Sequence, residues 1–203
     1  MRTLAIDTAT EACSVAFFDG SELLGASHEV MGRGHAERLI PSIAALPDKG
    51  RADRILVSLG PGSFTGVRIG IAAARALGVA WSAQVMGYPT LSLVAAQSRE
   101  ENPDAVTVCM NGGHGQWFVQ NFDSNGEAED AMQSLTPQQA TLACRHAVIA
   151  GNRAQELAVM FERGKRALNL LPDASKAPLL DDRWLTGDLA PIYGREPDAR
   201  LPA

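Results

Sequence analysis

Residues 55–80 read ILVSLGPGSFTGVRIGIAAARALGVA, an apolar segment joined to an alanine-rich segment by a turn that contains several glycines. The apolar run at 54–58 predicts a buried strand, and the run at 65–80 predicts a helix. A glycine-rich turn between a strand and a helix is typical of phosphate-binding loops. The spacing fits neither nucleotide motif, because no Gly-Lys-Ser/Thr follows and the dinucleotide pattern lacks its third glycine and its distant acidic residue. The N–H groups that open the helix would therefore bind an anion or be capped by Ser63 or Thr65.

A row of small residues runs along the predicted helix. They recur at every fourth position and so share one face: Gly66, Gly70, Ala74 and Gly78. Each glycine inside a helix costs about 1 kcal/mol relative to alanine, so this face is expected to approach another backbone closely. The sequence leaves open whether that backbone belongs to this chain or to a second one.

Around this unit the sequence predicts two halves with the same order of elements. The first half has strands at 3–7, 12–18, 22–26 and 54–58 and helices at 35–46, at 65–80 and from Thr90 onward. The second has strands at 105–110, 116–122, 128–135 and 147–150 and helices at 137–144 and 155–163. A polar break at 100–104 separates them, so we expect lobes at 1–100 and 101–203, each β-β-β-α-β-α. The proline-rich tail from Pro172 is expected to wrap the surface.

Composition and charge argue against several classes of protein. The net charge is −5, and it is uneven. Residues 1–100 carry nine basic and nine acidic side chains, whereas residues 101–203 carry nine and fourteen. A free-standing nucleic-acid binder would show a basic footprint, so phosphate contacts would have to come from another subunit. The three cysteines lie far apart, and neither a signal peptide nor a membrane-spanning segment is predicted, which indicates the cytoplasm.

Polar residues follow the first predicted strand. Asp7, Thr8 and Thr10 stand where an aspartate and hydroxyl groups would orient Mg²⁺ and phosphate oxygens. The same side chains also form turns by bonding to nearby backbone groups, so both interpretations stand. The four histidines form no His-x-x-x-His or HExxH pair, and no Gly-x-Ser-x-Gly occurs. The sequence therefore predicts no metal site and no serine nucleophile.

Five segments carry a family resemblance. They are LAIDTATEACSVAFFDG, GHAERLIPSI, LGPGSFTGVRIGIAAARALG, GYPTLSLVAA and PIYGREPDARLP, in chain order. Together they resemble the bacterial TsaB (YeaZ) family of tRNA threonylcarbamoyladenosine biosynthesis proteins, and GPGSFTGVRIG is highly specific for it. The match covers most of residues 3–97 and returns in the tail, while residues 105–180 match only in element order. The resemblance implies an α/β architecture, the two-lobed actin-like/Hsp70-like ATPase (ribonuclease H-like) fold, in agreement with the repeated element order.

The resemblance implies a role as well as a fold. Members of the family are non-catalytic subunits of the complex that places threonylcarbamoyl on N6 of adenosine 37 in ANN-decoding tRNAs. By resemblance, this chain is expected to bind the catalytic subunit TsaD, to join the ATPase TsaE in the assembled complex, and to form a homodimer when alone. It would contact tRNA only through the complex and would not contact a membrane. It would hold no cofactor of its own, ATP or ADP being bound at the level of the complex.

The docking surface that the resemblance implies lies on two helices. It would comprise eight residues: His35, Leu39, Ile43, Gly66, Val67, Gly70, Ala74 and Gly78. No catalytic residues are expected, because Thr90 and Val94 stand where TsaD carries its metal-binding His-x-x-x-His pair. An Asp-Ala-Arg-like motif that often opens the second lobe in the family is replaced here by MNGGHGQ at 110–116.

Two other functions stand as alternatives. One is an ATP- and Mg²⁺-dependent enzyme of the same fold that uses Asp7, Thr8 and Thr10. The weaker one is a metalloprotease of the glycoprotease type, for which the sequence offers no pair of ligands.

Overall fold

Each half of the chain builds a five-stranded sheet, and both sheets have the same strand order. The computed structural model describes residues 1–194. The first sheet, in the order β3-β2-β1-β4-β5, contains β1 (Arg2–Asp7), β2 (Ala12–Asp19), β3 (Glu22–Val30), β4 (Arg54–Ser58) and β5 (Gln84–Tyr88). The second, in the order β10-β9-β6-β7-β8, contains β6 (Val106–Gly113), β7 (Gln116–Phe122), β8 (Gln133–Leu135), β9 (Val148–Ala150) and β10 (Arg166–Leu168). Counted within each half, the orders are identical, so the predicted repeat is confirmed as a topological one.

Helices connect the parallel strands and cover the sheets. They are α1 (His35–Ala44), α2 (Phe64–Trp81), α3 (Thr90–Ser98), α4 (Pro137–Ala143) and α5 (Ala154–Ala158), with short 3₁₀ helices η1 (Pro47–Gly50), η2 (Ala174–Leu179) and η3 (Asp182–Trp184). In each half the first three strands are antiparallel neighbours, and the fourth runs parallel to the first. Parallel pairing requires a crossover connection, which α1 and α2 provide in the first half and α4 and α5 in the second.

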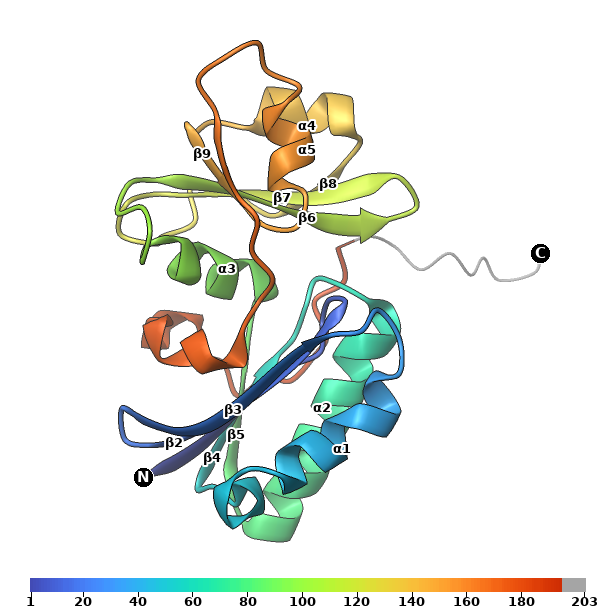
Figure 1. The fold of residues 1–203 in the computed structure, drawn as a ribbon, viewed down its shortest axis with the longest axis vertical. Coiled ribbons are helices and arrows are strands. Elements are labelled where there is room, and N and C mark those ends of the chain that lie inside the picture. Colours follow the sequence, from blue (N-terminus) through green and yellow to red (C-terminus); the bar gives the residue numbers. More distant parts are fainter. Residues whose placement is uncertain (195–203) are drawn as a thin grey trace, which may run out of the picture.

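The layers of the molecule follow from which face of each sheet is covered. Figure 1 shows α1 and α2 on one face of the first sheet, α4 and α5 on the far face of the second, and α3 and η2 between the sheets. Side chains alternate across a strand, so Leu4 and Ile6 of β1 join the core beneath α1 and α2 while Ala5 joins the core beneath η2. The apolar α3 is buried on nearly every side because it lies in the middle layer.

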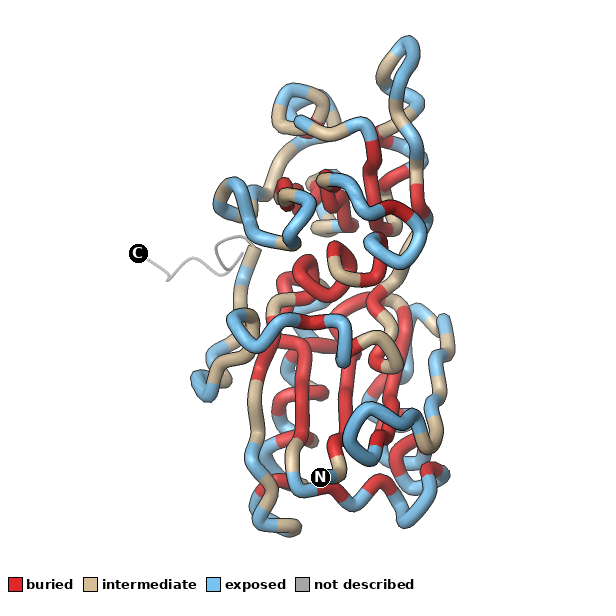
Figure 2. The backbone as a smooth tube through the Cα atoms, turned by 90° about the vertical axis from the view of Figure 1, so that its left-hand side faces the viewer, coloured by how far each residue is buried: buried red, intermediate tan, exposed pale blue. Residues whose placement is uncertain are grey.

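The tail crosses back to the first lobe. Ala174 and Ala177 are buried against the first sheet, and Thr186 pairs with Gly87 at the sheet edge. The Ile192 backbone N–H donates to the Leu59 carbonyl oxygen at 2.7 Å. In Figure 2 the buried part of the backbone runs through both sheets and the layer between them. The segment 174–192 therefore packs against the first lobe, although Trp184 and Arg183 also contact Phe122 and Glu127 of the second lobe.

Most predicted elements are present, but β8 begins at Gln133 and not at 128 as predicted, and three other elements differ. β5 follows α2 after only two residues and was not predicted, and neither was β10, which is three residues long. α5 ends at Ala158, short of the predicted end at 163. α1 continues through Pro41, whose ring lies on the exposed side of the helix. Among residues 1–194, no helix is both long enough and apolar enough to cross a membrane.

Candidate functional site

The glycine-rich turn before α2 packs against the loop that follows β1. A Cβ added at Gly62 would lie 2.0 Å from the Ala9 carbonyl oxygen, so only glycine fits there. The Ser63 backbone N–H donates to the same carbonyl at 2.6 Å. The Ser63 side chain accepts from the Gly66 N–H at 3.2 Å and caps the helix. The sequence left open whether these N–H groups bind an anion or are capped by a side chain, and the structure shows capping by Ser63.

The row of small residues on α2 faces the sheet of the same lobe. A Cβ at Gly66 would lie 2.1 Å from the Thr8 carbonyl oxygen, and one at Gly70 would lie 2.5 Å from the Thr8 hydroxyl oxygen. A Cβ at Gly78 would lie 2.4 Å from the side chain of Val85. The close approach predicted from the glycines is real, but its partner is internal. The predicted use of this row as a docking seam is wrong.

The other predicted docking residues are internal as well. His35, Leu39, Ile43, Val67 and Ala74 are all buried. The His35 ring nitrogen Nε2 lies 3.2 Å from the Ala12 carbonyl oxygen. Helical spacing identified the faces of α1 and α2 correctly, but these are the faces that the lobe covers with its own sheet. A docking surface on these helices must use their opposite sides.

The opposite sides of α1 and α2 carry two rows of small or aliphatic residues that are exposed to solvent. We call them together the outer face: Ala36, Ile40 and Ala44 on α1, and Ala72, Ala76 and Ala80 on α2. Val79, beside the second row, is 85% exposed. Neither row contains a charged side chain, although Glu37 on α1 and Arg68 and Arg75 on α2 are exposed beside them. The sequence contained this signal, since the alanines also recur every fourth position.

Two arginines that flank the outer face are held by the returning tail. The Arg68 guanidinium lies 3.5 Å from the centre of the Phe64 ring and donates to the Tyr193 hydroxyl at 2.8 Å. Arg75 donates to the Leu189 carbonyl oxygen at 3.2 Å. These contacts fix the side chains in place without a carboxylate partner of their own among the described residues. They leave two positive charges at the border of the outer face.

The candidate nucleotide residues mostly serve the fold. The Asp7 carboxylate is 1% exposed and accepts from the Ala9 N–H at 3.0 Å and from the Tyr88 hydroxyl at 3.1 Å. The Thr8 hydroxyl donates to the Gly66 carbonyl oxygen at 2.8 Å. Only Thr10 lines the cavity between the lobes. Asp7 and Thr8 are thus not available to phosphate or Mg²⁺ in this structure.

Burial of Asp7 predicts an unusual dependence of stability on pH. Desolvation raises the pKa of this carboxyl group from 3.8 to about 7, although hydrogen bonds from Ala9, Tyr88 and Ser58 oppose the shift. Between these two values the unfolded chain releases a proton that the folded chain retains, so the free energy of unfolding falls as pH rises from about 4 to 7. The loss is on the order of 4 kcal/mol when complete.

The matching variant is Asp7→Asn, which resembles the neutral acid and cannot ionise. We expect urea unfolding to show unmodified protein losing stability between about pH 4 and pH 7, while the variant loses much less. Equal losses in both proteins would contradict the assignment to Asp7.

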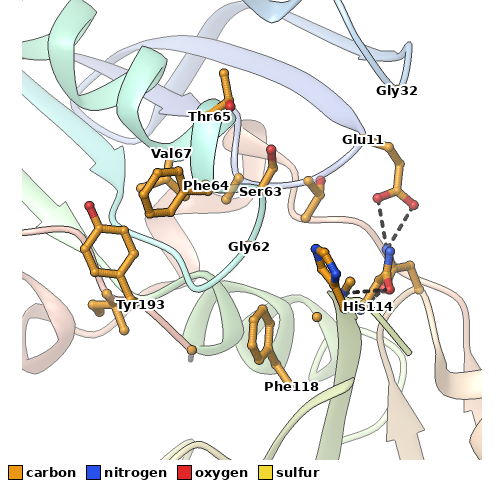
Figure 3. Close-up of a pocket in the computed structure, with 18 residues that line it drawn as sticks. Glu11, Gly32, Gly62, Ser63, Phe64, Thr65, Val67, His114, Phe118 and Tyr193 are labelled. Carbon is orange, nitrogen blue, oxygen red and sulfur yellow. Dashed lines mark hydrogen bonds between the residues drawn. The ribbon is translucent and has the colours of Figure 1, made fainter. Parts of the chain in front are cut away.

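A cavity of about 670 Å³ lies between the lobes at the N-terminal end of α2. Figure 3 shows the rings of Phe64 and Tyr193 on one side and that of Phe118 nearby, with Glu11 at the other end. The Asn152 side-chain nitrogen Nδ2 donates to both oxygens of the Glu11 carboxylate, at 2.9 and 3.0 Å. The segment that replaces the family's Asp-Ala-Arg-like motif supplies part of the lining through residues 111–114. The sequence did not predict this group of aromatic and amide residues, because they meet only where the second lobe and the returning tail lie against the first lobe.

The cavity is ill suited to nucleotide phosphates. None of the described residues that line it is lysine or arginine, and Glu11 adds a negative charge. Thr90 and Val94, which stand where TsaD carries metal ligands, are buried, and the Thr90 hydroxyl is paired with that of Ser58 at 2.7 Å. Within residues 1–194 there is no cluster of three His, Cys, Asp or Glu side chains placed to hold a metal ion.

Two lobes of identical strand order around a central cleft define a protein of the actin-like ATPase fold. Residues 24–171 match the family model described as TsaD: tRNA N6-adenosine threonylcarbamoyltransferase. The chain is 36% identical over 149 residues to the Escherichia coli tRNA threonylcarbamoyladenosine biosynthesis protein TsaB, which covers 68% of this chain and 64% of that protein. The match thus spans just under two thirds of the length of that relative.

Other relatives match over more of their length. An uncharacterized protein of Mycobacterium tuberculosis is 31% identical over 209 residues, covering 97% of this chain and 93% of that protein. Among solved structures, YeaZ from Pseudomonas aeruginosa has a TM-score of 0.73 at 28% identity, covering 86% of this chain and 87% of that chain. The chain belongs to the TsaB (YeaZ) family and also matches the family that the TsaD model describes.

Proposed function

We propose that this protein is a non-catalytic subunit that binds the catalytic subunit TsaD through its outer face and so supports formation of N6-threonylcarbamoyladenosine at position 37 of ANN-decoding tRNAs. The observation that carries the proposal is the exposed, uncharged outer face of α1 and α2. Family membership supports a role in tRNA threonylcarbamoyladenosine biosynthesis. The hydrogen bonds of Asp7 and Thr8 to groups within the chain support a non-catalytic role.

The outer face suits contact between helices. Small side chains allow a second helix to approach to the shorter end of the usual 8–10 Å interaxial range, where backbone and side-chain contacts are dense. Ile40 and Val79, which are 50% and 85% exposed, would supply apolar area that is lost to water on docking. Arg68 and Arg75 would lie at the rim, where charges set orientation and association rate more than affinity.

The same surface would serve more than one partner. A second copy of this chain would dock there when TsaD is absent, giving a homodimer that TsaD displaces. TsaE would join once TsaD is bound, and ATP or ADP would be held at the level of that complex. The net charge of −5 makes direct binding of tRNA by this subunit unfavourable, so tRNA would be bound through the complex. We place this assembly in the cytoplasm, where tRNA is modified.

Reconstitution tests the proposal. We expect purified TsaD with its remaining partners to modify an ANN-decoding tRNA only when this protein is added, and this protein alone to form no product. Calorimetry of the isolated chain with ATP and Mg²⁺ should show no binding tighter than about 1 mM, because the cavity lacks cationic side chains. Tight ATP binding with turnover that Asp7→Ala removes would overturn the proposal in favour of an enzyme.

A further inference from the structure

A second cavity, of about 230 Å³, lies on the face of the first sheet that α1 and α2 do not cover. Strand alternation places Arg54 and Leu56 of β4 on this face, since Ile55 and Val57 join the core on the other one. Thr3 of β1 is the register neighbour of Arg54. The segment from η2 to η3 closes the cavity only in part, with Leu180 and Asp182 in its lining.

Arg54 lacks a partner for its charge. Its Nε–H is shielded from solvent and has no acceptor, and among residues 1–194 the guanidinium forms no ion pair. Other arginines of the same lobe do find carboxylates, as Arg2 does with Asp48 and Arg38 with Glu29. A buried donor without an acceptor costs free energy, and a planar guanidinium matches a carboxylate in two parallel hydrogen bonds. A ligand with a carboxylate would satisfy this donor.

The rest of the lining defines the anion further. Thr3 and Ser21 line the same cavity, and neither hydroxyl group has a hydrogen-bond partner within the described chain. Leu56 and Leu180 supply an apolar wall. The Asp182 carboxylate also lines the cavity but pairs neither with Arg54 nor with any other described cation. One unpaired positive and one unpaired negative group thus share a cavity without meeting each other.

We propose that this cavity binds a small zwitterion of the α-amino acid class. Arg54 and the two hydroxyl groups donate hydrogen bonds to its carboxylate, and Asp182 accepts hydrogen bonds from its ammonium group. The leucines contact a short apolar side chain. The cavity is smaller than the roughly 300–1,000 Å³ of sites for drug-sized ligands, which excludes a nucleotide. Asp182 disfavours an inorganic phosphate, whose charge it would repel. The site is separate from the outer face and from the cavity between the lobes.

Titration of the full chain, followed by NMR or calorimetry, tests this assignment. The probes are L-valine, isovalerate, which lacks the ammonium group, and isobutylamine, which lacks the carboxylate. We expect saturable binding of L-valine in the millimolar range, at least tenfold weaker binding of isovalerate, and none of isobutylamine. No saturable binding of L-valine, or binding of isovalerate as tight as that of L-valine, would overturn the proposal.

Two variants separate the roles of the charges. Arg54→Met should abolish binding of L-valine and of isovalerate, because the guanidinium that binds their carboxylates is lost. The aliphatic part of the side chain remains. Asp182→Asn, at an exposed position that the fold tolerates, should reduce L-valine binding to the level of isovalerate and leave isovalerate unchanged. If both variants bind L-valine as the unmodified protein does, the observed binding lies elsewhere and the assignment is wrong.

Discussion

Gly66→Ala is expected to destabilise this protein by about 3 kcal/mol or more, at the upper end of what overpacking costs. The added Cβ would lie 2.1 Å from the Thr8 carbonyl oxygen, which is backbone and cannot rotate away. Two hydrogen bonds hold the helix at this distance, from the Thr8 hydroxyl to the Gly66 carbonyl and from the Ser63 N–H to the Ala9 carbonyl. The roughly 1 kcal/mol that alanine gains in a helix interior is too small to offset the clash.

Urea unfolding measures this effect directly. Gly187→Ala is a matched control, because nothing lies within 4 Å of a Cβ at that position. We expect the control to unfold within about 0.5 kcal/mol of the unmodified protein. A Gly66→Ala protein with an unchanged unfolding midpoint would show that α2 does not pack on β1 as described.

Ala76→Glu is expected to abolish docking of TsaD while leaving the fold intact. Ala76 lies in the exposed row of α2, so the folded monomer accommodates the larger side chain in solvent. In a complex, the same side chain would bring an unpaired charge and extra volume into a close helix contact, at a cost of at least about 3 kcal/mol, or more than a hundredfold in affinity. Co-elution with TsaD in size-exclusion chromatography should be lost, with unchanged urea unfolding.

Leu142→Glu is the matched control for that experiment. Leu142 is 88% exposed on α4, on the far side of the second lobe from α1 and α2 (Figure 1). The change also places a glutamate on an exposed helix, so it controls for net charge and for loss of apolar surface. Equal loss of co-elution in both variants would point to charge alone and against a contact at the outer face.

The sequence was sufficient for most of the fold. Alternating and continuous apolar runs identify β1, β2 and β4, and the duplicated order of elements survives as an identical strand order in the two sheets. The failures are short elements such as β10, where three residues give no readable period. The path of the tail was also missed, because contacts such as that between Leu59 and Ile192 join residues far apart in sequence.

The residues predicted as a docking surface lie on faces of α1 and α2 that the same lobe covers. Periodicity shows that Gly66, Gly70 and Gly78 share a face; it does not show what covers that face. Here the covering atoms are those of Thr8 and Val85 in the same chain. Small residues allow a helix to approach the sheet of its own lobe as readily as they allow it to approach a partner protein. Only the direction of the face in three dimensions separates the two.

Titration calorimetry of purified TsaD with three proteins tests whether the outer face is the docking surface. The unmodified chain and Leu142→Glu should bind with the same affinity and a stoichiometry of one to one. Ala76→Glu should bind at least a hundredfold more weakly, even though its fold is intact. If Ala76→Glu binds TsaD as tightly as the unmodified chain, the outer face of α1 and α2 is not the docking surface and the account fails.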